Sequence, residues 1–160
     1  MIDAQVLTAL QAELTRERQN AAIYDALAAS LNAVNWPGSA AFLAKSAGEE
    51  REHAQKFSDY IVDRNALPQY GALEICPALD GDDLVEYFQA ALETEQGTTA
   101  AINTLFRLAD DRADAQTEIF LHFFVDEQTD SERVLYDFLL ELRRYAGDPD
   151  GYKLFDNSLE

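Results

Sequence analysis

The stretch Gly48-Glu-Glu-Arg-Glu-His53 places one glutamate, Glu50, three residues before a histidine, His53, within a segment whose apolar residues recur with a helical period. Residues three apart lie on one face of a helix, so both side chains can reach the same ion. Two other apolar helix faces, far away in the chain, are each interrupted once by a glutamate, at Glu17 and at Glu95. Carboxylates and one imidazole that converge from separate helices predict a site for a pair of iron-like cations.

The composition is that of a folded protein. A chain of 160 residues, 48% of them apolar, is long enough to form one domain, residues 1–160, with a substantial core. The net charge of −18, from 30 acidic and 12 basic residues, disfavours nucleic acid as a partner because phosphate would be repelled. No apolar stretch approaches the roughly 18 residues that cross a bilayer, and the first residues lack a signal-peptide pattern. We therefore expect no membrane partner and a cytoplasmic protein. Cys76 is the only cysteine, which excludes a disulfide within the chain and a rubredoxin-type iron site.

Apolar residues recur with a helical period along most of the chain. This pattern predicts helices over residues 3–33, 39–64, 81–109, 113–145 and 152–159. Residues 65–79 have no such period and contain two prolines and a glycine, so they predict a long connection that crosses the domain. The sequence therefore predicts an all-α protein: a four-helix bundle with a long crossover between its second and third helices, plus a short fifth helix at the C-terminal end.

Polar residues indicate where the predicted helices begin. Asp3 is a candidate N-cap of the first helix, and Asp80 or Asp82 is a candidate N-cap of the third. Residues 35–38 and 148–151 have the composition of turns. A corner as short as residues 35–38 predicts that the first two helices pack as antiparallel neighbours.

Glu17, Glu50 and Glu95 fall at comparable depth if the predicted helices align antiparallel. Burying an ionised carboxylate without a partner costs several kcal/mol, and three such groups together would repel one another. Bound cations would offset that repulsion, and the imidazole of His53 favours iron, manganese or zinc over calcium or magnesium. Alternatively, these glutamates point to solvent or pair with basic side chains, the candidates being Arg16, Arg18, Lys56 and Arg107. Their alignment on three helices favours the metal site.

The fourth predicted helix carries Glu127-Gln-Thr-Asp-Ser-Glu132 at the same depth. A symmetric di-iron bundle would have a second Glu-x-x-His here, but Asp130 stands where that histidine would be. The apolar residues of this helix predict that Gln128 and Ser131 point inward and that Glu127 and Asp130 flank them. The second metal therefore has fewer strong ligands than the first, which suits a metal ion that binds, reacts and leaves.

The chain resembles the ferritin family, and specifically the prokaryote-type non-haem ferritins. The resemblance covers nearly the whole chain and rests on Glu17 with Tyr24 and on residues 41–53, 60–68, 93–96, 124–128, 147–151 and 154–157. It implies a ferritin-like bundle that assembles as a homo-oligomer, in this family a hollow 24-subunit shell. It also implies a ferroxidase centre, which oxidises Fe²⁺ with O₂ or H₂O₂, and storage of Fe³⁺ as mineral inside the shell.

The resemblance implies roles for individual residues. Two irons would be held by five side chains: Glu17, Glu50, His53, Glu95 and Gln128. Of these, Glu17, Glu50 and His53 bind the first iron, and Glu50 bridges to the second. Tyr24 matches the tyrosine beside the family's centre, which hydrogen-bonds a ligand or supplies an electron, and it is the candidate catalytic residue. A core tyrosine without a redox role is the alternative.

A third iron site of bacterial ferritins is matched by Glu49, Glu127 and Asp130, although Ser131 stands where many of these proteins carry a further glutamate. Iron is the metal that the resemblance implies, and haem is not expected. Arg51 occupies the position of the haem-ligating methionine of bacterioferritins, and the chain's one methionine is its first residue.

The sequence is compatible with three functions. An iron-storage ferritin with ferroxidase activity is the leading hypothesis. The second is a di-iron oxidase or peroxidase of the rubrerythrin type without storage, although the chain lacks a second Glu-x-x-His and the cysteines of a rubredoxin site. The third is a metal-free helical interaction module whose buried acids are merely paired polar groups.

Overall fold

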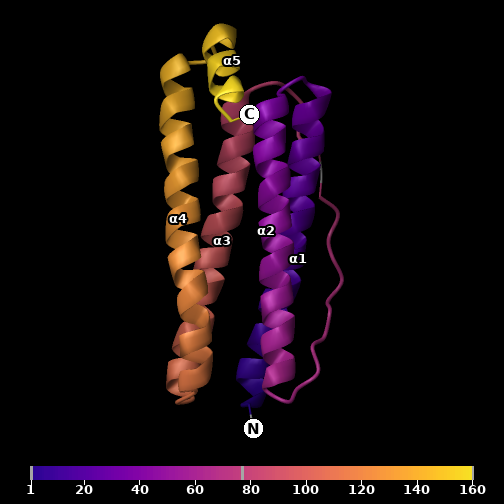
Figure 1. Cartoon of the computed structure of the whole chain (residues 1–160), viewed down its shortest axis with the longest axis vertical. Helices are drawn as coiled ribbons and strands as arrows, with labels where there is room; N and C mark the ends of the chain where they lie inside the picture. Colours follow the sequence, from indigo (N-terminus) through magenta and orange to yellow (C-terminus); the bar gives the residue numbers. More distant parts are fainter. Residues whose placement is uncertain (1, 77, 160) are drawn as a thin grey trace.

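The computed structural model describes residues 2–76 and 78–159 of the chain. Five helices lie within these residues. They are α1 (Ala4–Ala33), α2 (Pro37–Asp63), α3 (Leu84–Asp111), α4 (Ala115–Tyr145) and α5 (Pro149–Asn157). α1 and α2 form one antiparallel pair, α3 and α4 form another, and the two pairs lie side by side (Figure 1). The short α5 lies at the end of the bundle where α4 ends (Figure 1). The predicted all-α four-helix bundle with a short fifth helix is confirmed.

The segment between α2 and α3 runs the length of the bundle along its outside, as a long crossover (Figure 1). Gln11, Thr15 and Gln19 are spaced four residues apart on one face of α1, and each hydrogen-bonds the backbone of this segment. The Thr15 hydroxyl, for example, accepts from the N–H of Gly71 at 3.1 Å. A Cβ at position 71 would lie 2.8 Å from the Thr15 side chain, so this close approach requires glycine.

Four predicted helix starts were wrong by a few residues, and three of them are those of α2, α3 and α5. α2 begins at Pro37 rather than at residue 39, because a proline in the first turn of a helix gives up no hydrogen bond. α3 is capped by Asp83, whose side chain accepts from the N–H of Val85, rather than by Asp80 or Asp82. α5 begins at Pro149, so the residues predicted as a turn form its first turn.

The starts of the other two helices follow from side-chain caps. The predicted cap of α1 is confirmed, because Asp3 accepts from the N–H groups of Gln5 and Val6 at 2.8 and 3.3 Å. α4 begins at Ala115 rather than at residue 113, because the Asp114 side chain accepts from the N–H of Thr117 and so sets the N-terminus of the helix.

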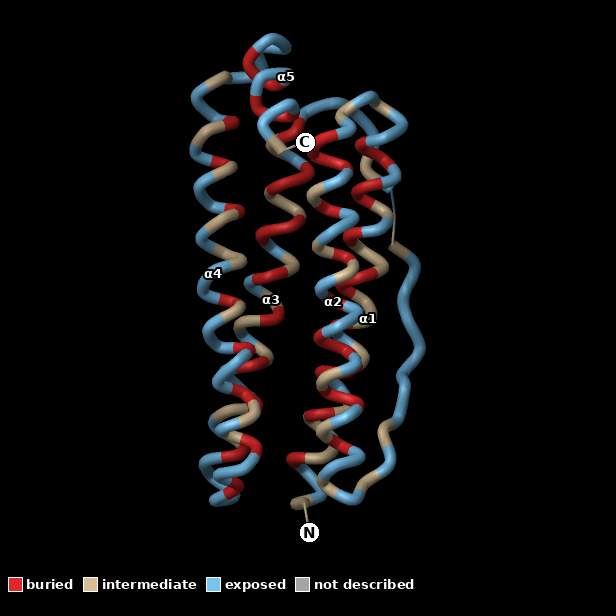
Figure 2. The backbone as a smooth tube through the Cα atoms, in the orientation of Figure 1, coloured by how far each residue is buried: buried red, intermediate tan, exposed pale blue. Residues whose placement is uncertain are grey.

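The buried apolar residues form two clusters, one toward each end of the bundle. Buried residues face the interior along all four long helices (Figure 2). On α1, for example, Leu31 belongs to the cluster near α5, and Leu10 belongs to the cluster at the opposite end. On each long helix, the stretch between the two clusters carries buried polar side chains, which are Glu17, Asn20, Glu50, His53, Glu95, Thr98 and Gln128. We call these seven residues the polar layer.

Aromatic side chains set the spacing of α2 and α4 on either side of the polar layer. Toward α5, the rings of Phe42 and Phe138 meet edge to face, with centroids 5.2 Å apart. On the other side, the rings of Phe57 and Phe124 lie 4.4 Å apart. Such bulky pairs hold the two helices at a distance, and room for a ligand remains between the two contacts.

The C-terminal helix is tied to the start of α2 by one buried carboxylate. Asp156 of α5 accepts from the N–H of Gly38 at 3.1 Å and from the N–H of Ser39 at 2.6 Å. These are N–H groups of the first turn of α2, which have no partner within their own helix. A Cβ at position 38 would lie 2.0 Å from the backbone oxygen of Asp156, so glycine is needed there for α5 to dock.

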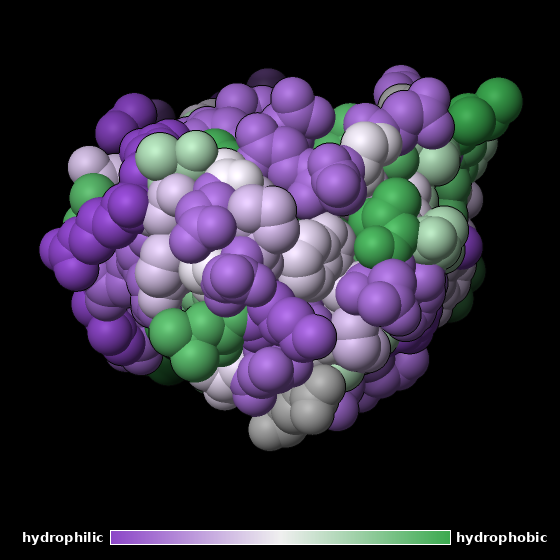
Figure 3. Space-filling view, turned by 90° about the horizontal axis from the view of Figure 1, so that it is seen from above, coloured by the Kyte–Doolittle hydropathy of each residue, from purple (hydrophilic) through white to green (hydrophobic). Residues whose placement is uncertain are grey.

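Hydrophilic residues cover most of the end of the bundle that is seen from above, with a few separate hydrophobic groups between them (Figure 3). Among the described residues, no helix combines the length and the apolar character that crossing a membrane requires.

Candidate metal centre

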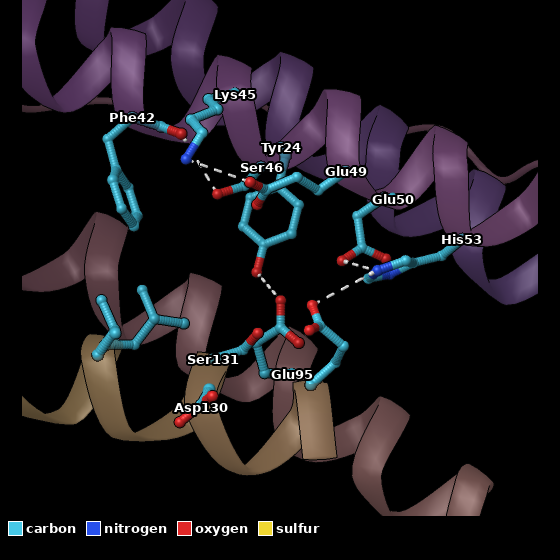
Figure 4. A pocket seen from close by; sticks show the side chains of 13 residues that line it. Tyr24, Phe42, Lys45, Ser46, Glu49, Glu50, His53, Glu95, Asp130 and Ser131 are labelled. Carbon is cyan, nitrogen blue, oxygen red and sulfur yellow. Dashed lines mark hydrogen bonds and ion pairs between the residues drawn. The ribbon is translucent and has the colours of Figure 1, made fainter. Parts of the chain in front are cut away.

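Glu17 of α1 meets Glu50 and His53 of α2 in the polar layer. One ligand atom from each of the three side chains lies within 4.8 Å of the other two. The Nδ1 atom of His53 is 3.9 Å from Glu17 Oε2 and 3.9 Å from Glu50 Oε1. Glu50 and His53 point the same way from neighbouring turns of α2, as their spacing in the sequence predicts (Figure 4).

Three atoms in this cluster lack a hydrogen-bond partner among the described residues. They are both carboxylate oxygens of Glu17 and the Nδ1 atom of His53, all of them buried. Buried polar atoms are nearly always hydrogen-bonded, so orphaned atoms that face one another point to a ligand. Atoms bound to a divalent transition metal at about 2.0–2.2 Å lie roughly 3–4 Å apart, which is the spacing found here. Two carboxylates and one imidazole fit iron, manganese or zinc.

Glu95 enters the polar layer from α3, on the side opposite Glu50. The hydroxyl of Tyr24 points at Glu95 and donates to its Oε1 atom (Figure 4). Gln128 donates from Nε2 to Glu95 Oε2 at 2.9 Å. Each oxygen of this carboxylate therefore has one donor and keeps a free lone pair, so the group is oriented but can still bind a cation.

Burial shifts the titration of these acids. It raises the pKa of Glu95 to about 7, and the Glu50 carboxylate adds to the rise, whereas the donors Tyr24 and Gln128 oppose it. Burial, reinforced by Glu50, also raises the pKa of Glu17 well above its ordinary value. Glu17 and Glu95 therefore hold protons to a higher pH than ordinary glutamates do, and a bound cation would displace those protons. Burial and the Glu95 carboxylate raise the pKa of Tyr24, so this phenol stays a hydrogen-bond donor.

A cavity of about 210 Å³ opens from the polar layer between α2 and α4. The three residues predicted as a third iron site also line it, namely Glu49, Glu127 and Asp130. They are far more accessible than the layer itself, with 73% of the Asp130 side chain exposed. Glu49 pairs with Lys45 at 3.3 Å, and Glu127 lies 3.9 Å from the Nε2 atom of His53. The cavity thus connects the buried cluster to an acidic mouth.

Gln128 lies behind Glu95 rather than on the wall of the cavity. It is buried, as its predicted inward orientation requires, but its amide nitrogen contacts the Glu95 side chain and the Glu95 backbone oxygen. Ser131, in contrast, lines the cavity. The geometry therefore shows Gln128 as a partner of Glu95 in the absence of a cation.

Two buried residues beside the cluster were missed by sequence reasoning. Glu13 is 3% exposed, and its Oε2 atom pairs with Arg16 at 3.4 Å. Burial raises the pKa of Glu13 to about 7, although Arg16 opposes the rise. Its place four residues before Glu17 on the same apolar face was a signal that could have found it. Arg16, a candidate partner of the layer's glutamates by sequence, pairs with Glu13 instead.

Asn20 is the second missed residue. It donates from Nδ2 to Thr98 at 2.8 Å and to Glu50 Oε2 at 3.4 Å, so it links α1, α2 and α3 at the level of the cluster. A single buried asparagine has no distinctive pattern in the sequence, so only the structure could reveal it. Its contact helps to fix the orientation of the Glu50 carboxylate.

The fold and the buried cluster together define a ferritin-like protein. A family model for the ferritin-like domain matches residues 7–145. The chain is 31% identical over 159 residues to the bacterial non-heme ferritin of Staphylococcus aureus (strain USA300). This alignment covers 99% of this chain and 95% of that relative. The chain is also 31% identical over 159 residues to the bacterial non-heme ferritin of Staphylococcus saprophyticus, again over 99% of this chain and 95% of that relative. This chain belongs to the ferritin family.

Solved ferritin structures have the same fold. An open pore ferritin from the hyperthermophilic archaeon Archaeoglobus fulgidus matches with a TM-score of 0.96 at 25% sequence identity, covering 99% of this chain and 98% of that one. A closed form of that ferritin, engineered by site-directed mutagenesis, gives a TM-score of 0.95. The match includes the short C-terminal helix, because it extends over almost the whole of both chains.

Proposed function

We propose that this ferritin binds two Fe²⁺ ions in the polar layer, oxidises them with O₂ or H₂O₂ and stores the Fe³⁺ as mineral inside a protein shell. One observation carries the proposal. Both oxygens of Glu17 and Nδ1 of His53 are buried, face one another beside Glu50 and lack partners among the described residues. A cation supplies the positive charge and the bonds that these atoms need. Membership of the ferritin family favours iron as that cation.

The first Fe²⁺ is held by Glu17, Glu50 and His53. The second Fe²⁺ is held by Glu95 and by Glu50, whose carboxylate bridges the two ions; its charge acts on both Glu17 and Glu95, which supports this role. Each Fe²⁺ gives one electron to the oxidant when it becomes Fe³⁺. The protein contributes a fixed geometry and negative charge that favours the higher oxidation state, while the redox chemistry belongs to the metal.

The centre is asymmetric. The first ion has two carboxylates and an imidazole, whereas the second has Glu50 and Glu95 with Gln128 placed behind Glu95. Ser131 adds only a hydroxyl to the wall of the cavity. A less strongly held second ion is suited to leaving after oxidation, which storage requires. Tyr24 acts here by holding Glu95 in place, and its nearness also allows it to supply an electron.

Glu49, Glu127 and Asp130 would form a transit site at the mouth of the cavity. Their exposure allows ions to exchange quickly, and the 3.9 Å between Glu127 and His53 links this site to the first iron. Lys45 competes for the site, because its ammonium group already pairs with Glu49.

The same proposal includes assembly as a homo-oligomeric, 24-subunit shell in the cytoplasm, without haem. Large apolar side chains lie along the crossover and are exposed to solvent in the isolated subunit, which supports association with other subunits. Leu67 is 83% exposed and Ile75 is 95% exposed. Exposed apolar groups gathered on one segment are typical of a surface that a partner covers.

Aerobic loading with Fe²⁺, followed by sizing of the product, tests this function. A large particle that retains many irons per subunit is the expected result. Turnover of Fe²⁺ in a small oligomer that retains no iron would instead identify an oxidase or peroxidase of the rubrerythrin type. A protein that neither binds nor oxidises Fe²⁺ would refute both metal functions.

A further inference from the structure

Hydrogen bonds extend the polar layer beyond Gln128 to a carboxylate outside the iron cavity. Gln128 Nε2 donates to Glu95 Oε2 at 2.9 Å and reaches the hydroxyl oxygen of Thr99 at 3.4 Å. The Thr99 hydroxyl in turn donates to Glu132. Thr99 stands one turn after Glu95 on α3, and Glu132 stands one turn after Gln128 on α4. The two side chains meet because helical side chains lean toward the N-terminus of their own helix, and α3 and α4 are antiparallel.

This chain of hydrogen bonds has a direction that Glu132 determines. An ionised carboxylate can only accept, so the Thr99 hydroxyl must donate its single proton to Glu132. The Thr99 oxygen can then only accept, which requires Gln128 to present its amide nitrogen rather than its carbonyl. The same nitrogen must therefore face Glu95. The amide nitrogen of Gln128 is therefore held by three acceptors on one side, which are the backbone oxygen of Glu95 at 3.1 Å, Glu95 Oε2 and the Thr99 hydroxyl, and Glu132 fixes the last of these as an acceptor.

We propose that Thr99 and Glu132 are positioning residues that lock the Gln128 amide against Glu95 and so hold the Glu95 carboxylate ready for the second cation. The proposal rests on the proposed function only in assigning Glu95 to that cation. It gives a role to two residues that no feature of the sequence singled out. It also shows how the second ion can be bound although Ser131 supplies no carboxylate.

Release of the lock would leave the amide less firmly held. Thr99, Gln128 and Glu132 line a groove of about 320 Å³ between α3 and α4, so water can reach the amide from that side. Without the hydroxyl or the carboxylate, the amide nitrogen is left with the backbone oxygen and Oε2 of Glu95 as its acceptors and loses the contact that holds it from the next turn of α3. The donor to Glu95 Oε2 would then be positioned less firmly, and so would the Glu95 carboxylate. The first cation, held by Glu17, Glu50 and His53, would not be affected.

Anaerobic titration of the full, chelator-stripped chain with Co²⁺ tests the proposal, because the visible absorption of Co²⁺ reports the ligands and the geometry of each bound ion. The variants are Thr99→Val, Glu132→Ala, the corresponding double variant and Glu132→Gln. Thr129→Val is the matched control. Thr129 lines the same groove, but its hydroxyl donates to the backbone oxygen of Val125, outside this chain of hydrogen bonds.

The parent should bind two Co²⁺ ions per subunit. Thr99→Val and Glu132→Ala should each weaken only the second ion, by about tenfold, the low end of the range for residues behind a metal ligand. The double variant should be no worse than either single variant, since each already breaks the chain. Glu132→Gln keeps an acceptor for Thr99 and should stay within about twofold of the parent, as should Thr129→Val.

Four results would overturn the proposal: parent-like binding by Thr99→Val, equal weakening of both ions, additive losses in the double variant, or a loss in Glu132→Gln as large as in Glu132→Ala. Aerobic Fe²⁺ oxidation by the parent is measured separately. A parent that binds two Co²⁺ ions but does not oxidise Fe²⁺ would refute the ferroxidase function, and the Co²⁺ comparison among the variants would still decide the role of Thr99 and Glu132.

Discussion

Replacing Glu95 by glutamine should stabilise the metal-free protein at alkaline pH. Burial raises the pKa of Glu95 from 4.5 to about 7, which corresponds to a cost of about 3 kcal/mol when the group is ionised in the folded state. The folded state binds the proton more tightly than the unfolded state, so the cost is absent below pH 4.5 and is complete above pH 7. Glutamine is never ionised and avoids the cost at every pH. Its side-chain oxygen can accept from Gln128, and its amide can donate to the hydroxyl oxygen of Tyr24.

Thermal unfolding of the parent and of Glu95→Gln, followed by circular dichroism at one subunit concentration, measures this effect. Both proteins are stripped of metal, and pH 5.5 and pH 8 are compared, above the isoelectric point of about 4.2. The advantage of the variant should grow by about 2 kcal/mol between the two pH values, and the melting temperature at pH 8 should rise by roughly 5–10 °C. Glu93→Gln, on the exposed side of α3, is the matched control and should shift little. A variant that is no more stable than the parent at pH 8 would refute the claim that Glu95 is an ionised, uncompensated acid in the metal-free fold.

Three further predictions concern α5, the protons of the centre and the cavity wall. Asp156→Ala should lower the free energy of unfolding by roughly 2–4 kcal/mol, because it uncaps α2 and leaves two buried N–H groups unpaired. In the same denaturation assay, Asp150→Ala, at an exposed position of α5, should cost less than about 1 kcal/mol. Co²⁺ binding should release protons below pH 7, and the Co²⁺ affinity should fall about tenfold for each unit by which the pH is lowered, per proton released. Calorimetry in buffers of different ionisation enthalpy measures the number of protons released. A Co²⁺ affinity that does not change between pH 5.5 and 7 would be evidence against the raised pKa values. Ser131→Glu adds a carboxylate to the cavity and should tighten binding of the second Co²⁺, so unchanged affinity in a titration would show that position 131 does not reach that ion.

The helices and their arrangement could be predicted from the sequence because their signals are local. Apolar residues with a helical period define each long helix, and the long stretch without such a period, residues 65–79, defines the crossover. Errors arose at the helix starts, where several polar residues compete to cap the same turn. Asp83, rather than Asp80 or Asp82, caps α3, and the prolines at 37 and 149 begin helices rather than ending turns.

The meeting of Glu17, Glu50 and His53 could be predicted because each interrupts an apolar face at matching depth. Contacts behind these residues could not, since they depend on the direction of individual side chains. Gln128 faces Glu95 rather than the cavity because its amide nitrogen finds acceptors on Glu95 and on Thr99, and residue spacing alone does not predict these contacts. The pairing of Glu13 with Arg16 likewise depends on side-chain conformation rather than on spacing alone.

Stopped-flow oxidation of Fe²⁺ by Glu50→Ala tests the central claim most directly, because Glu50 is the one carboxylate assigned to both irons. Glu52→Ala is the control, since this neighbour on α2 also removes one negative charge but is exposed. The parent and Glu52→Ala should show the same rapid oxidation phase, and Glu50→Ala should lose it while retaining its helical structure. Rapid oxidation by Glu50→Ala at the rate of the parent would contradict the assignment of the buried cluster as the site of iron oxidation.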